Sequence, residues 1–305
     1  MVTLGGETMG TRWRVLAVRP PRGIDAAIRA RLDTLVAQMS HWDAGSALSR
    51  FNRAAGGTWH ALPPDLAHVV HMALEVASAS NGAFDPAIGR LVDLWGFGPS
   101  GPQHAPSAAA LAAARAASGW ARLDWDAAAR RLRQPGGLAL DLSGIAKGHA
   151  VDTLADLLAD HGVADALVEV GGELVGCGVQ PTGEPWWVDL EAPPGAAVTP
   201  LRVALHGLAV ATSGDYVRGP HNLDPRTGAP ATGGLAVVSV LTPTAMCADA
   251  WATALTVLGP EEGLAAATRE GLAARLVTRD GERLSPALAA MLEDGPEPGG
   301  ASLTP

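Results

Sequence analysis

The segment 141–148, DLSGIAKG, combines residue types that bind phosphate with residue types that bind metal ions. It stands where the apolar run 138–142 gives way to a helical pattern, and the first turn of a helix offers free backbone N–H groups to anions. It is not a Walker loop, because the order G-x-x-x-x-G-K-[ST] is absent. A glycine turn with a capping aspartate fits equally well, but Lys147 is the single lysine of the chain. That rarity favours a chemical role.

Asp249 and Thr253 are spaced four residues apart in a predicted helix over 245–258. Positions i and i+4 share a helix face, so the two side chains point the same way. A carboxylate, a hydroxyl and main-chain carbonyls or waters make an oxygen site suited to Mg²⁺ rather than zinc. The alternative is an aspartate that favours the helix dipole next to an ordinary packed threonine.

His221 begins the segment 221–228, HNLDPRTG. The DP and TG pairs are typical of a tight turn, but a turn does not require the histidine. A histidine oriented by a carboxylate can act as a general base near neutral pH. A lone histidine without that role is the alternative.

Aromatic residues gather in the segments 40–52 and 82–98, although the whole chain has only 3 Phe and 1 Tyr. Both segments also contain turn-forming residues. They could wall a flat ring system, or they could simply anchor loops in the core.

Hydrophobic periodicity predicts the elements that must position these residues. Helices are expected at 24–39, 64–79, 107–118, 148–160, 245–258 and 261–270, and strands at 11–18, 123–125, 138–142, 166–170, 186–191, 202–205 and 236–241, with a hairpin around 280–281. The runs 123–125 and 138–142 are expected to form a hairpin that leads into the site. Strands and helices alternate irregularly, which favours an α+β fold with mixed or antiparallel sheets and flanking helices over a doubly wound parallel sheet.

Composition excludes several classes of protein. The chain of 305 residues is 48% hydrophobic, enough for one domain over 1–293, followed by a Gly- and Pro-rich tail, 294–305, that we expect to be disordered. The net charge of −9 and the absence of a basic run argue against nucleic-acid binding. The sequence contains no run of 18 apolar residues, so no transmembrane segment is predicted.

The cysteines and the first residues bear on the cellular compartment. Cys177 and Cys247 lie far apart and outside any metal-binding or redox spacing, so we expect two buried, reduced thiols. The first residues show neither an export signal nor a lipobox, which predicts a cytoplasmic protein, or a periplasmic one if a signal has been removed.

Seven short motifs occur in an order that resembles the ApbE-type FAD:protein FMN transferases. They lie at 9–11, 49–52, 82–86, 94–98, 141–148, 224–228 and 248–254. Each motif alone is weak, but the ordered set is specific, and the similarity spans about residues 4–285. The resemblance implies a T-fold-related architecture of two lobes that enclose a cleft.

The resemblance also implies a reaction. FAD is cleaved at its diphosphate, FMN passes as a phosphoester to a Thr or Ser of a target flavoprotein, and AMP is released. His221 would take the proton from the acceptor hydroxyl, and Lys147 would stabilise charge on the phosphates. The main-chain carbonyl of Gly144, with Asp249 and Thr253, would hold Mg²⁺. By motif position, the FAD contacts would be Met9, Trp42, Ala83, Phe84, Asp85, Asp141, Lys147 and Leu223.

Two residues depart from the family pattern. Many members have Tyr where Trp42 stands, and an aromatic residue where His149 stands. Neither change removes a group that the chemistry needs. Two other functions remain open from the sequence: a Mg²⁺-dependent FAD diphosphatase that uses water as acceptor, and a non-catalytic flavin-binding protein.

Overall fold

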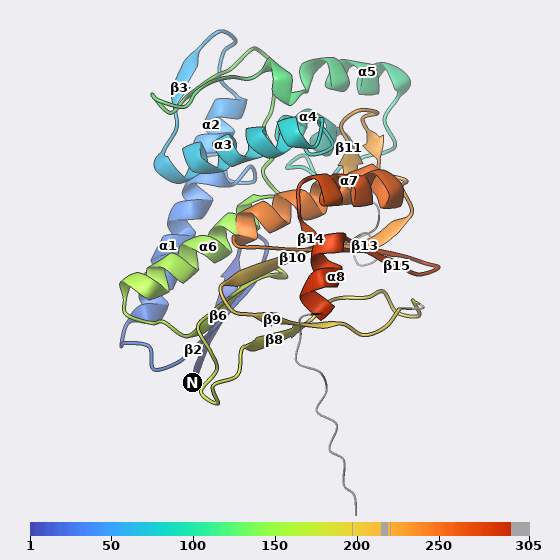
Figure 1. The fold of residues 1–305 in the computed structure, drawn as a ribbon. Helices are drawn as coiled ribbons and strands as arrows, with labels where there is room; N and C mark the ends of the chain where they lie inside the picture. The colour runs from blue at the N-terminus through green and yellow to red at the C-terminus, as the bar shows by residue number, and fades with distance from the viewer. Residues whose placement is uncertain (197, 215–218, 220, 294–305) are drawn as a thin grey trace, which may run out of the picture.

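An eight-stranded antiparallel sheet forms one layer of the molecule (Figure 1). The computed structural model describes residues 1–196, 198–214, 219 and 221–293. Across the sheet the strands are β1 (Val2–Thr8), β2 (Thr11–Ala17), β6 (Ala166–Val170), β7 (Glu173–Cys177), β10 (Leu208–Gly214), β13 (Leu235–Thr242), β14 (Ala273–Thr278) and β15 (Glu282–Leu284).

Two long helices cover one face of this sheet and lie side by side. α6 (Ala146–Asp160) packs on β6 and β7, and α7 (Ala245–Arg269) packs on β10 and β13. α1 (Ile24–Met39) lies against α6, and α3 (Pro64–Ala79) packs on both α1 and α7. The site residues on α6 and α7 are therefore held between the sheet and a second helical layer.

The remaining elements lie at the two ends of this stack in Figure 1. Beyond α3 are α2 (Ala47–Asn52), α4 (Gly89–Leu94), α5 (Ala108–Ala117) and a small sheet of β3 (Trp59–Ala61), β5 (Arg131–Arg133) and β4 (Asp124–Asp126). Against the other face of the large sheet lie the β8 (Trp186–Asp189) and β9 (Arg202–Leu205) hairpin and α8 (Pro286–Glu293), which share an apolar cluster with that face.

The structure confirms the predicted α+β class, because the strand pairs of the described residues are antiparallel and helices flank the sheet. The predicted helices 24–39 and 64–79 and strands 166–170 and 202–205 are found with the same bounds. The two helices predicted on either side of Gly259 are found as the two halves of α7, which is kinked at Gly259 because its φ of 81° and ψ of −178° are not helical. Two lobes remain a prediction.

The strand predicted at 138–142 is wrong. Its backbone bonds to a side chain and a loop instead of a strand: Leu140 exchanges hydrogen bonds with the Asn52 amide, and Asp141 N donates to Pro86 O. The hairpin before the site is β4 with β5. Prediction also missed the strands β1, β3, β5, β7, β10, β11 and β12 and the helices α2, α4 and α8.

Both cysteines are free thiols, but they are half-buried, whereas the sequence predicts buried ones. None of the helices that the structure describes is long and apolar enough to cross a membrane. The predicted disordered tail, 294–305, lies outside the described residues.

Candidate active site

Lys147 lies in the first turn of α6, and its ammonium stands between two carboxylates. Its Nζ is 2.5 Å from Glu173 Oε1 and 3.6 Å from Asp249 Oδ1. The lysine side chain is 25% exposed, whereas each carboxylate side chain is 3% exposed, so the cation lies at the mouth of a buried acidic pair. Burial alone would lower the pKa of Lys147, but the charges of Asp249 and Glu173 raise it above its usual value. Lys147 is therefore a cation that can face an anionic ligand.

Two tight turns at one end of the large sheet position this lysine. Gly171 and Gly172 form a two-residue loop between β6 and β7, with φ values of 66° and 104°. Positive φ at both positions is the geometry of a type I′ hairpin, which favours glycine. A Cβ added to Gly171 would lie 2.9 Å from Thr11 Cγ2 and 3.1 Å from Lys147 Cδ, so the close approach also needs glycine. Met9, at φ 48°, begins the corresponding turn between β1 and β2 at this end.

α6 and α7 hold each other's first turns through two carboxylates. Asp249 of α7 accepts a hydrogen bond from Gly148 N at 3.0 Å. In return, Asp152 of α6 accepts from Ala245 N at 2.7 Å and Met246 N at 2.9 Å. These amides lack partners within their own helix, so each acid satisfies groups that would otherwise be left unpaired. A Cβ on Gly148 would overlap the Ala245 carbonyl oxygen, which means that only glycine permits this contact.

Gly144 and Thr253 meet directly beside Asp249. A Cβ added to Gly144 would lie 2.8 Å from Thr253 Oγ1 and 3.4 Å from Phe84, so a glycine brings this backbone against the hydroxyl. Asp249 lies one turn earlier on the same helix and is buried. These carbonyl, hydroxyl and carboxylate oxygens have the chemistry of a hard-cation site. The described residues contain no cluster of three or more His, Cys, Asp or Glu that could hold a metal, so a metal here depends on such mixed oxygen ligands.

Asp141 lies at the other end of the same loop. Its Oδ1 accepts from Ser143 N at 2.8 Å and from Ser143 Oγ at 2.5 Å, which shapes the turn into α6. His41 Nδ1 is 3.8 Å from Asp141 Oδ2. The Trp42 ring lies 5.4 Å from that of His41 and is 62% exposed. An exposed indole beside this loop offers a stacking surface for a flat ring.

The loop 82–86 brings Phe84 to the site and uses Asp85 to hold its own shape. Asp85 accepts hydrogen bonds from Ala87 N at 2.7 Å and Trp120 N at 3.1 Å, and its burial raises its pKa to about 6. Ala83 and Phe84 are buried beside it. Asp85 also lines a hollow of about 400 Å³ together with Arg115 and Pro225. This hollow joins the loop to the segment that carries His221.

His221 and Leu223 lie at the start of a short hairpin, β11 (Leu223–Asp224) and β12 (Ala229–Pro230). The Trp95 indole donates to Gly228 O at 2.8 Å and Arg115 donates to Arg226 O at 2.6 Å, so the hairpin is docked on α4 and α5. His221 Nδ1 is 2.9 Å from Gly219 O, and Leu223 is buried.

The contacts thus bring together Lys147, Asp249, Gly144, Thr253 and Phe84, while the other predicted residues stand on adjoining loops. Sequence reasoning missed Glu173 and Asp152. The signal for Glu173 was a Gly-Gly pair that follows an apolar strand and precedes an acid.

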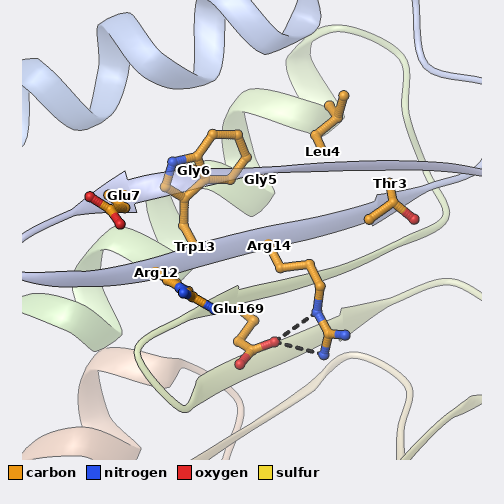
Figure 2. Close-up of a pocket in the computed structure, with 9 residues that line it drawn as sticks. All are labelled: Thr3, Leu4, Gly5, Gly6, Glu7, Arg12, Trp13, Arg14 and Glu169. Carbon is orange, nitrogen blue, oxygen red and sulfur yellow. Dashed lines mark hydrogen bonds and ion pairs between the residues drawn. The ribbon is translucent and has the colours of Figure 1, made fainter.

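A separate hollow of about 660 Å³ lies along the sheet edge (Figure 2). It is lined by Thr3, Leu4, Gly5, Gly6, Glu7, Arg12, Trp13, Arg14 and Glu169. Arg14 and Glu169 form an ion pair across it at 2.8 Å, and Arg29 covers the Gly5 carbonyl with a hydrogen bond of 2.9 Å. None of the predicted site residues lines this hollow.

Comparison with known proteins agrees with this geometry. The sequence profile of the ApbE family matches residues 9–276. FAD:protein FMN transferases of Klebsiella pneumoniae and Salmonella typhimurium are each 37% identical to the chain, over 92% of this chain and 85% of theirs.

Solved structures give the same result. The apo flavinyl transferase ApbE of Pseudomonas stutzeri superimposes with a TM-score of 0.90 at 37% identity, over 96% of this chain and 97% of that one. The flavin transferase ApbE of Vibrio cholerae gives a TM-score of 0.89 at 33% identity, over 95% and 98% of the two chains. Since the profile covers most of the chain and the relatives exceed 30% identity along nearly its whole length, this chain belongs to the ApbE family.

Proposed function

We propose that the chain cleaves FAD and transfers FMN to a Thr or Ser hydroxyl of a target flavoprotein, with Mg²⁺ as its cofactor and AMP as the second product. FAD:protein FMN transfer is the activity by which its curated relatives are named. One observation carries the proposal beyond the family. The ammonium of Lys147 lies 3.6 Å from Asp249 Oδ1 near the start of α6, and Thr253, one turn later on the helix of Asp249, meets Gly144, so a cation and hard-oxygen donors lie close together.

The residues of this cluster match the demands of phosphoryl transfer. In such reactions catalysis comes mainly from positioning and from stabilising charge on the phosphates. Lys147 supplies a positive charge in the first turn of α6. The Gly144 carbonyl, Asp249 and Thr253 would hold Mg²⁺, which would act as a Lewis acid toward the diphosphate. The net charge of −9 makes such local positive charge more necessary.

His221 is proposed as the general base. It would take the proton from the acceptor hydroxyl while the hydroxyl oxygen attacks the phosphorus of the FMN half. The bond from that phosphorus to the bridging oxygen breaks, and AMP leaves with the electron pair. FAD would be held by Met9, Trp42, Ala83, Phe84, Asp85, Asp141, Lys147 and Leu223. Since the Asp85 carboxylate already accepts two backbone N–H groups, we expect it to shape the FAD-binding loop.

The test is a transfer assay with FAD, Mg²⁺ and an acceptor flavoprotein domain. We expect the intact mass of the acceptor to rise by one FMN, with one AMP released for each flavin attached. An acceptor in which the target Thr is changed to Ala should stay unmodified. The His221→Ala chain should still bind FAD but release AMP much more slowly. AMP formed without flavin on the acceptor would instead identify a diphosphatase.

A further inference from the structure

Glu173 is a buried acid to which the proposed reaction assigns no role. It begins β7 and is 2% exposed. Its Oε1 pairs with Lys147 Nζ at 2.5 Å, while its Oε2 has no hydrogen-bond partner within the part of the chain that the structure describes. A carboxylate removed from water needs a compensating charge or hydrogen bonds. Burial raises the pKa of Glu173, and the charge of the Lys147 ammonium opposes this rise, so Lys147 is the group that favours the charged form of the acid.

The Lys147 ammonium lies closer to one of its two acids than to the other. Glu173 Oε1 is closer to the ammonium than Asp249 Oδ1, by the distances of 2.5 and 3.6 Å. The other oxygen of Asp249, Oδ2, already accepts from Gly148 N. Oδ1 is therefore the Asp249 oxygen that both an ammonium and a metal ion would compete for.

We infer that Glu173 is a positioning residue: it holds the Lys147 ammonium and thereby leaves Asp249 Oδ1 for the metal ion. The β6–β7 hairpin makes this possible, because Gly171 lets the lysine stem pass and Glu173 follows directly after the turn. Without the Glu173 charge, Lys147 would turn to Asp249 as its remaining acid and oppose the cation there. This inference rests on the Mg²⁺ site of the proposed function.

The first experiment measures Mg²⁺ binding to the full chain by calorimetry, without FAD. Glu173→Gln keeps the size of the side chain and removes its charge, and we expect Mg²⁺ to bind about tenfold more weakly. Glu169→Gln is the matched control. Glu169 lies in the same hairpin and loses the same charge, but its partner is Arg14 at 2.8 Å, so binding should stay within about twofold. Equal effects of the two substitutions would overturn the inference.

The second experiment asks whether Glu173 acts through the lysine. In a Lys147→Met chain no ammonium competes for Asp249, so adding Glu173→Gln should change Mg²⁺ affinity by less than about twofold. A full tenfold loss in that background would mean that Glu173 acts on the ion by its charge alone. That result would also overturn the inference.

Asp replacements keep the test decisive if Glu173→Gln does not fold. Glu173→Asp retains the charge but withdraws it from Lys147, and it should weaken Mg²⁺ binding more than Glu169→Asp does. Equal binding by these two chains would again contradict the inference. Absence of Mg²⁺ binding to the unaltered chain would refute both the inference and the metal site. Normal Mg²⁺ responses without FMN transfer would refute only the proposed function.

Discussion

Two buried charge clusters meet on α6, and they differ in how fully their charges are matched. Lys147 has two acids, one of which keeps an oxygen with no partner among the described residues. Two residues later, His149 belongs to a cluster around Asp65 on α3, where one acid receives several donors. The first cluster has two acids for one ammonium and an acceptor oxygen without a partner among the described residues. In the second cluster one acid is paired with one arginine and accepts a further hydrogen bond from Gln38.

The Asp65 cluster has the properties of a structural support. Asp65 accepts from Arg31 at 2.9 and 2.5 Å and from Gln38 at 2.8 Å, and His149 Nε2 lies 3.2 Å away. Burial alone would raise the pKa of Asp65, but the hydrogen bonds and charges of Arg31 and His149 lower it to about 2. Burial also lowers the pKa of His149. A saturated cluster ties α1, α3 and α6 together, whereas an unsaturated one is able to take a ligand.

Of all the tests, removal of the metal should distinguish the roles of the two clusters most strongly. With EDTA we expect FMN transfer to fall to background, because the ion proposed to bind Asp249 and Thr253 would be removed, and added Mg²⁺ should restore it. The Asp65 cluster contains no such site, so the folded structure should persist, as followed by circular dichroism. Full transfer in the chelator would refute the metal assignment.

Lys147→Met should have the next largest effect. Loss of one preorganised charge at a phosphoryl-transfer site typically costs about 10²–10³ in rate, and we expect a reduction of that order in kcat/KM. The contrasting variant is Asp65→Asn, for which kcat/KM at 25 °C should stay within about threefold. If Lys147→Met kept more than a tenth of the activity, the lysine would be structural, like His149.

Asp65→Asn should instead lower stability. Removing one partner of this partly buried ion pair should cost about 2 kcal/mol of unfolding free energy, measured by urea denaturation at pH 7. Asp25→Asn is the control, since Asp25 forms an exposed i,i+4 pair with Arg29 and its loss should leave the urea midpoint nearly unchanged. Similar losses in the two variants would show that the Asp65 cluster contributes no more than a surface pair.

The same variant should show a pH dependence with a defined sign. The folded pKa of Asp65, about 2, lies below its ordinary value of 3.8, so its charge stabilises the folded state above about pH 4. That contribution is lost as the pH falls from about 4 towards 2. The stability difference between the unaltered chain and Asp65→Asn should therefore be constant from pH 7 to 5 and should shrink at pH 3.5. An increase at low pH would contradict this sign.

The sequence by itself determined the local elements and the candidate chemistry. The helices 24–39 and 64–79 were predictable because helical periodicity is a short-range property. The i,i+4 spacing placed Asp249 and Thr253 on one face, and the single lysine pointed to the turn into α6. The ordered motifs predicted the family.

Only the tertiary structure decided how these groups share their charges. The run 138–142 resembles a strand, yet its backbone bonds to Asn52 and Pro86, which are distant in sequence. Glu173 lies 26 residues from Lys147, and its pairing depends on the β6–β7 turn against Thr11. Electrostatic matching is a sum over neighbours in space, and sequence spacing does not reveal those neighbours. The open acidic pair beside Lys147 is therefore a property of the fold.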